Sequence, residues 1–160
     1  MFQDVFTHIH PIMVHFPIAI IIMATCYDLF LVIVKRKLSP RQGFWLWFVA
    51  FISALIAIGT GPDADARGNT NLFHIHVTLA YITTTLTFIV VAFRFFCIYK
   101  RKELLKSLLV VYCILSILCT VGILSVGYYG GKMVYDQGVG VKTDGKYVNP
   151  PVQGRFHHDE

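Results

Sequence analysis

The stretch IAIIIMATCYDLFLVIV, residues 18–34, decides the fold, because its only charged residue is Asp28. A helix of about 20 predominantly apolar residues is long enough to cross the hydrocarbon core of a membrane. Extended back to Pro11, the apolar run reaches that length, and Lys35 begins a basic cluster directly after it. We therefore predict a transmembrane helix over residues 11–34.

The composition of the whole chain also indicates a membrane protein. Of its 160 residues, 56% are hydrophobic and 14% are charged, whereas an ordinary soluble domain has about 25% charged residues. Much of the positive charge lies in two short links, KRKLSPR (35–41) and KRKELLK (100–106). Basic residues between apolar runs set the orientation of a membrane protein, so we expect no nucleic-acid partner.

Three further apolar runs follow the first one. They cover about residues 43–60, 73–99 and 104–129. Four spans joined by short links form an up-down-up-down bundle. The predicted fold is therefore an all-α bundle of four transmembrane helices over residues 1–131, with a short irregular tail over residues 132–160.

The basic links also predict the orientation of this bundle. Loops rich in Lys and Arg stay on the cytoplasmic side, so both basic links are expected there. The link GPDADARGN (61–69) holds one Arg against two Asp, and it is then extracytoplasmic, as are both chain ends. The tail is expected either as a loose extension or as a small lid on the outer face.

Histidines gather at the two helix entrances that this topology places on the outer side. His8, His10 and His15 lie at the start of the first span, and His74 and His76 lie at the start of the third. In an up-down-up-down bundle these two helices are diagonal partners with the bundle interior between them. The two histidine groups are therefore expected at the same depth.

Helix phase narrows the choice among these histidines. Residues three, four or seven positions apart share a helix face. The face of His76 contains Ala80, then Thr83, Thr87 and, further along, Arg94. This polar and partly small stripe is typical of a side that faces the bundle interior.

The face of His15 has a small residue in the equivalent place. Ala19 follows His15 by one turn, as Ala80 follows His76. The two alanines would leave space for a flat cofactor between the helices. The alternative is that small residues simply allow membrane helices to pack closely.

Two imidazoles that face each other across a bundle suit a b-type haem, whose iron takes one nitrogen from each. We predict His15 and His76 as the axial ligands, with His10 and His74 in reserve. No C-x-x-C-H motif is present, so covalent attachment of the haem is not expected. One haem near the outer face would pass single electrons between a membrane quinol and an extracytoplasmic redox protein. If the protein is an enzyme, it would then be a membrane oxidoreductase.

Other interpretations of the same histidines stay open. With Asp63 or Asp65 they could bind Cu, Ni or Zn, which all accept imidazole, in a protein that binds or transports the metal. The histidines could also be plain interfacial residues, or titrate for proton handling. The protein could instead be a structural subunit of a larger complex; besides lipid, a second copy of the chain is a candidate partner.

Two charged residues and one proline inside the spans each allow two structural interpretations. Asp28 and Arg94 are deep enough to form an ion pair, although Arg94 could instead extend toward the basic link. Pro17 could kink a continuous helix. Alternatively, the helix begins near Pro17, which then stands in its first turn, and the residues before it form an interfacial segment.

Several of these motifs together resemble one known family. HPIMVHFPIAI (10–20), GTGPDA (59–64), the histidine-bearing start of the third span and GGKMVYDQGVGV (130–141) are similar to the bacterial membrane family catalogued as domain of unknown function 2231. The resemblance implies a multi-pass protein of the bacterial inner membrane. Members of this kind occur joined to cytochrome-type or other redox domains, which favours electron transfer. The resemblance also implies that His10 and His15 are the motif histidines, together with His74 or His76.

Overall fold

The computed structural model of the protein describes residues 9–61 and 70–150. The first predicted span is divided into a short helix α2 (Ile9–Met13) and a long helix α3 (His15–Lys35). Pro17 therefore stands in the first turn of α3, where its missing N–H costs no helical hydrogen bond. Residues 9–13, before the start of α3, form the short helix α2.

The other three spans are the helices α4 (Phe44–Gly59), α5 (Leu72–Tyr99) and α6 (Lys106–Tyr135). In the described part of the chain, the segment α2–α3 and the helices α5 and α6 are long and apolar enough to cross a membrane. Helix α4 has 16 residues and is about 24 Å long, which is less than the roughly 30 Å of a hydrocarbon core.

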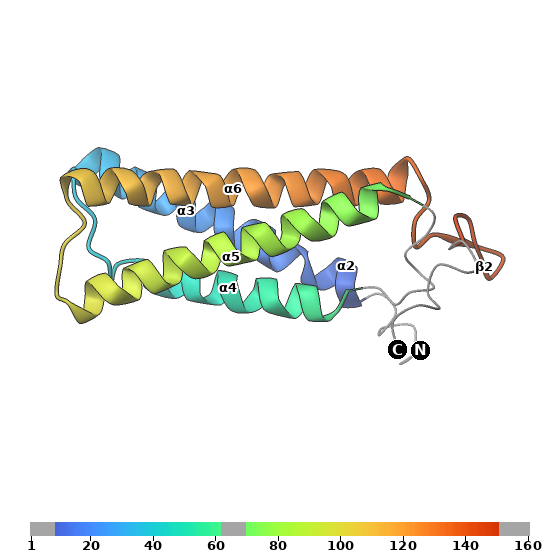
Figure 1. Ribbon diagram of the computed structural model, residues 1–160, viewed down its shortest axis with the longest axis horizontal. Helices are drawn as coiled ribbons and strands as arrows, with labels where there is room; N and C mark the ends of the chain where they lie inside the picture. The colour runs from blue at the N-terminus through green and yellow to red at the C-terminus, as the bar shows by residue number, and fades with distance from the viewer. Residues whose placement is uncertain (1–8, 62–69, 151–160) are drawn as a thin grey trace.

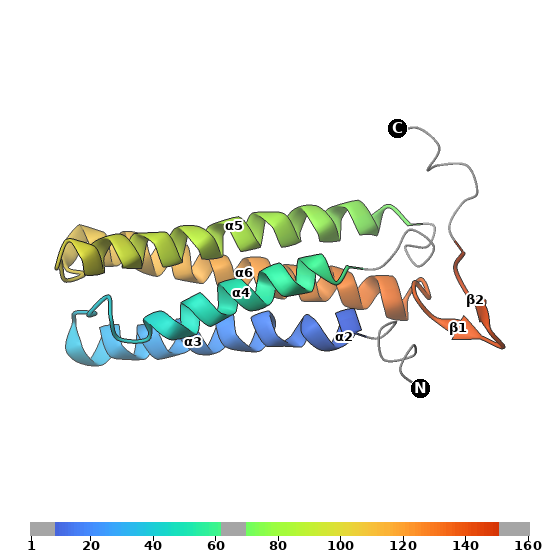
Figure 2. The same ribbon diagram turned by 90° about the horizontal axis from the view of Figure 1, so that it is seen from below.

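The helices form the predicted bundle. Each helix packs against its neighbour in the chain, and α3 also packs against α6, so α3 and α5 are diagonal (Figures 1 and 2). The links over residues 36–43 and 100–105 lie together at one end of the bundle, called the basic end below. His10 and His76 lie toward the other end, called the histidine end.

The two links at the basic end are tied to each other. The backbone N–H of Leu104 donates to the carbonyl oxygen of Leu38 at 3.2 Å, and the N–H of Leu38 donates back at 3.5 Å. Both leucine side chains are buried. This contact fixes how α3 and α4 meet α5 and α6.

The C-terminal part is more ordered than the expected irregular tail. Helix α6 continues through Gly130 and Gly131 to Tyr135, because glycine is tolerated in membrane helices. A small antiparallel hairpin then pairs β1 (Lys142–Thr143) with β2 (Lys146–Tyr147). Its turn is Asp144-Gly145, and both residues have positive φ, 51° and 77°, as a type I′ turn requires.

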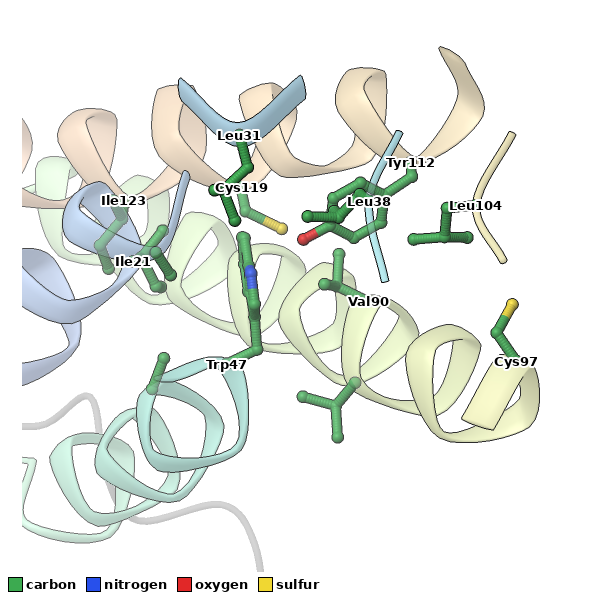
Figure 3. Close-up of a cluster of buried hydrophobic side chains, with 13 residues drawn as sticks. Ile21, Leu31, Leu38, Trp47, Val90, Cys97, Leu104, Tyr112, Cys119 and Ile123 are labelled. Atoms are coloured by element: carbon green, nitrogen blue, oxygen red, sulfur yellow. The ribbon is translucent and has the colours of Figure 1, made fainter. Parts of the chain in front are cut away.

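The side chains have the distribution of a membrane protein, because large apolar groups cover the outside and the few buried polar groups lie within an apolar interior. Large apolar side chains are exposed along α3, α4, α5 and α6. An apolar cluster fills the middle of the bundle and includes Trp47, which reaches from α4 toward the other helices (Figure 3). Among the described residues, the buried polar and charged side chains are Thr25, Asp28, Thr83, Thr84, Thr87, Arg94 and Ser116.

Candidate functional site

His10 connects the short helix α2 to α4. Its ring nitrogen Nδ1 lies 3.0 Å from the carbonyl oxygen of Ala57, near the end of α4. The side chain is half-buried. Helix α2 packs against α4 as well as α3, in agreement with this contact.

His76 makes the equivalent contact on the other side of the bundle. Its Nδ1 lies 3.1 Å from the carbonyl oxygen of Val126 on α6. The ring rests against Gly130, where a Cβ atom would come within 3.2 Å of the His76 Cε1. The glycine therefore makes room for the imidazole between α5 and α6.

These two contacts determine which ring nitrogen of His10 and His76 carries the proton. A carbonyl oxygen can only accept a hydrogen bond, so Nδ1 must be the donor in each ring. In a neutral imidazole the other nitrogen, Nε2, then keeps its lone pair. The histidine end thus presents two half-buried imidazoles, each with a nitrogen available as a metal ligand.

His15 and His74 lie differently from this pair. His15 is exposed, and its Nδ1 lies 2.5 Å from the carbonyl oxygen of Pro11, so its hydrogen bond stays within the N-terminal segment. His74 is exposed and its ring contacts that of Phe73. His10, and not His15, therefore shares with His76 a contact to the backbone carbonyl of a neighbouring helix.

The remaining residues predicted for the site differ in exposure, and some lie outside the described residues. Ala19 is exposed and Ala80 is half-buried, so the space expected beneath His15 does not face the interior. His8, Asp63 and Asp65 lie outside the described residues. Within residues 9–61 and 70–150, no group of three or more His, Cys, Asp or Glu side chains could hold a metal ion.

A second polar group lies near the basic end, where Asp28 and Arg94 form the predicted ion pair. The Arg94 Nη1 lies 2.6 Å from the Asp28 Oδ2, and both side chains are almost completely buried. Arg94 also reaches the first basic link, as the alternative expectation had it. Its Nε donates to the Pro40 carbonyl at 3.2 Å and its Nη2 donates to the Gln42 carbonyl.

Two aromatic side chains complete this ion pair. The Trp47 Nε1 donates to the Asp28 Oδ2 at 2.8 Å, and the Tyr112 hydroxyl also donates to that oxygen. The same hydroxyl accepts from the Arg94 Nη1 at 2.6 Å. All four long helices therefore contribute one side chain to this group. We name it the ion-pair cluster: Asp28, Trp47, Arg94 and Tyr112.

Sequence reasoning did not identify Trp47 and Tyr112 as members of the ion-pair cluster. In an apolar run, both aromatic residues look like ordinary core-packing side chains. A usable signal existed, because the indole N–H and the phenol O–H need a hydrogen-bond partner when they are buried. Asp28 and Arg94 were the only charged groups deep enough in the spans to provide one.

The chain belongs to the family described as "Predicted membrane protein (DUF2231)", whose model matches residues 7–143. It is a multi-pass membrane protein, as its long apolar helices also indicate. No curated protein and no solved structure matches the chain.

Proposed function

We propose that this member of the family is a small membrane cytochrome that holds one b-type haem between His10 and His76. The observation that carries the proposal is the pair of Nδ1 contacts to the carbonyls of Ala57 and Val126. Metal-bound histidines in proteins nearly always donate their other ring N–H to such a partner, which fixes the ring's orientation and tautomer. Both rings of this pair are held in that way.

The number of imidazoles favours haem over a simple metal ion. A porphyrin supplies four of the iron's ligands, so a protein needs to add only two. Zinc sites take three or four ligands from the protein. His10 and His76 alone therefore match the needs of haem iron. When bound, haem supplies single-electron transfer.

The residues of this chain would hold and orient the group. Ala57 and Val126 keep the Nε2 lone pairs of the two histidines available, and Gly130 keeps the His76 ring free of a neighbouring side chain. The basic end belongs on the cytoplasmic side by the positive-inside rule. The histidine end would then meet an extracytoplasmic redox protein and a membrane quinol as electron partners.

The test is an absorption spectrum of the full chain, expressed with ample haem and purified in detergent. We expect a Soret band that shifts on reduction with dithionite. His10→Ala and His76→Ala should each lose the bis-histidine spectrum, whereas His15→Ala and His74→Ala, matched exposed controls, should keep it. Each variant is first checked for a monodisperse elution profile.

Two results would contradict the proposal. One is the absence of a Soret band in the wild-type protein. The other is a spectrum that survives in His10→Ala but is lost in His15→Ala. Elemental analysis of the same samples tests the alternative, because stoichiometric copper, nickel or zinc without iron would favour a metal-binding or metal-transporting protein.

A further inference from the structure

A pocket lies between the two links at the basic end, at the end of the bundle opposite the histidine pair. Its volume is about 210 Å³, which is enough for several water molecules. Residues of the first link line one side, and residues from the end of α5 and the second link line the other. We name it the link pocket and define it by the four charged residues that line it: Arg41, Arg101, Lys102 and Glu103.

The backbone beneath the link pocket is held in place by the rest of the basic end. Two of the residues that line the pocket, Pro40 and Cys97, are buried. The Pro40 carbonyl accepts a hydrogen bond from the Arg94 Nε at 3.2 Å. The two links are also joined by the backbone contact between Leu38 and Leu104. The fold itself therefore brings the charged residues of the two links to one place.

The three basic side chains of the link pocket are available to a ligand. Arg41, Arg101 and Lys102 are exposed. Within residues 9–61 and 70–150, no ion pair and no side-chain hydrogen bond involves them. Against them stands one carboxylate, that of Glu103, so the pocket is positive. Arginine and lysine are the residues that bind phosphate groups in proteins, and an anion with a phosphate group is therefore the ligand that this pocket fits.

The surroundings of the link pocket favour a lipid headgroup over a free phosphate ion. Exposed aromatic side chains, those of Phe95, Phe96 and Tyr99, cover the last turns of α5 that lead to the pocket. Tyrosine is enriched where a membrane meets water, so the pocket lies at the level of the headgroups with an apolar helix surface beside it for acyl chains. Basic pockets between membrane helices on the cytoplasmic side typically bind anionic headgroups.

We propose that the link pocket binds the headgroup of one anionic phospholipid, of the phosphatidylglycerol type. The phosphodiester contacts Arg41 from the first link and Arg101 and Lys102 from the second. The hydroxyl groups of the headgroup donate to the Glu103 carboxylate, which can only accept. The bound lipid thus bridges the two links and adds to the contacts that join them. This site involves neither haem nor the histidine pair.

The test is native mass spectrometry of the full chain in detergent, titrated with phosphatidylglycerol or with phosphatidylethanolamine of the same acyl chains. We expect one phosphatidylglycerol per chain, bound more tightly than phosphatidylethanolamine, whose headgroup has no net charge. Arg41→Gln and Lys102→Gln should each lower the affinity about fivefold, as expected for the loss of one basic residue beside an anionic headgroup. Equal affinities for the two lipids would overturn the proposal.

Arg101→Gly separates the role of the side chain from that of the backbone. Arg101 follows the C-cap of α5 and has a φ of 53°, a conformation that glycine adopts without steric cost. The variant therefore removes the guanidinium and leaves the helix end unstrained. We expect the affinity for phosphatidylglycerol to fall about fivefold, while the thermal stability of the lipid-free protein stays the same or rises.

Arg36→Gly is the matched control for Arg101→Gly. Arg36 is an exposed arginine at the same end of the bundle, with a φ of 55° at the C-cap of α3, but it does not line the link pocket. This variant loses the same charge and should keep the affinity of the wild type. Equal losses in the two glycine variants would show that the overall charge of the basic end attracts the lipid, and this would overturn the link pocket as a site.

Inorganic phosphate distinguishes the two sources of the anion. Added in large excess over the lipid, it should leave the phosphatidylglycerol bound, because it lacks the acyl chains that contact the helix surface. Complete displacement of the lipid by phosphate would assign the pocket to a free anion and overturn the lipid as its occupant.

Discussion

The histidine end and the basic end of the bundle both join helices through polar side chains, but in opposite ways. His10 and His76 contact backbone carbonyls of neighbouring helices with one nitrogen and keep the other nitrogen unprotonated. In the ion-pair cluster, Asp28, Trp47, Arg94 and Tyr112 instead bond mainly to one another, and Arg94 also donates to two carbonyls of the first basic link. The comparison indicates that the basic end holds the bundle together, whereas the histidine end keeps bonding capacity for a ligand.

The largest effect should come from breaking the ion pair. Replacing one partner of a buried pair costs about 3–5 kcal/mol, because the other charge is left uncompensated. We expect Arg94→Met to lower the free energy of unfolding by that amount and Asp28→Leu to do the same. The double variant, which leaves no charge behind, should recover most of the loss. Thermal unfolding in detergent measures this cycle, and single variants as stable as the wild type would refute the assigned role of the basic end.

The aromatic members of the cluster should show a smaller effect. Tyr112→Phe removes a hydroxyl that donates to Asp28 and accepts from Arg94. Loss of one partner of a buried hydrogen bond to a charged group costs about 1–3 kcal/mol. The same measurement on Tyr128→Phe, an exposed tyrosine of the same helix, should show no change. Equal stability of the two variants would contradict the contact.

The histidine end should tolerate the loss of its side chains better. His10→Ala and His76→Ala each remove one ordinary hydrogen bond, worth about 1 kcal/mol. His15→Ala should change stability still less, because its ring is exposed. If His76→Ala destabilised the haem-free bundle as strongly as Arg94→Met, the two ends would not differ as described.

Gly130 offers a way to disturb the His76 ring without removing it. A Cβ there would lie 3.2 Å from the ring, so Gly130→Ala should shift the imidazole by a few tenths of an ångström. We expect haem binding to weaken while the free energy of unfolding changes by no more than about 1 kcal/mol, the helix propensity difference. Gly127→Ala is the control, since its Cβ would meet Ile18 at an ordinary 3.7 Å. A haem titration that does not distinguish the two variants would contradict this.

The smallest effect is expected in the C-terminal hairpin. Gly145 has a φ of 77°, which disfavours any residue with a Cβ. Gly145→Ala should loosen the hairpin by about 1 kcal/mol and leave both ends of the bundle unchanged. Hydrogen exchange would then increase around residues 142–147 only, and a change within α6 would be unexpected.

Much of the fold follows from the sequence because apolar length and basic links are strong signals. The ends of α4 and α5 fall within one residue of the predicted spans. The polar face of α5 was predicted as well, since a regular helix repeats every 3.6 residues. Helix α6 ends at Tyr135, beyond the predicted limit near residue 129, because the apolar run weakens there although glycine is common inside membrane helices.

The position of His10 could not be derived from helix phase. The phase of His15 describes α3, but α2 ends at Met13 and packs partly on α4. His10 and His15 are five residues apart, which is about 140° round a helix, so they face different directions. The family resemblance named His10 on motif grounds, without the contact to the Ala57 carbonyl. The acceptors of these histidine contacts are the backbone carbonyls of Ala57 and Val126, so the side-chain types at these two positions give no sign of the contacts in the sequence.

The shortness of α4 has a consequence for the surrounding lipid. A segment of about 24 Å is shorter than its three partners, so the bilayer has to thin or the flanking links have to sink on that side of the molecule. Lipids with short acyl chains would meet this hydrophobic mismatch with less strain than long ones. The protein should therefore be most stable in thin membranes, with the bilayer thinnest beside α4.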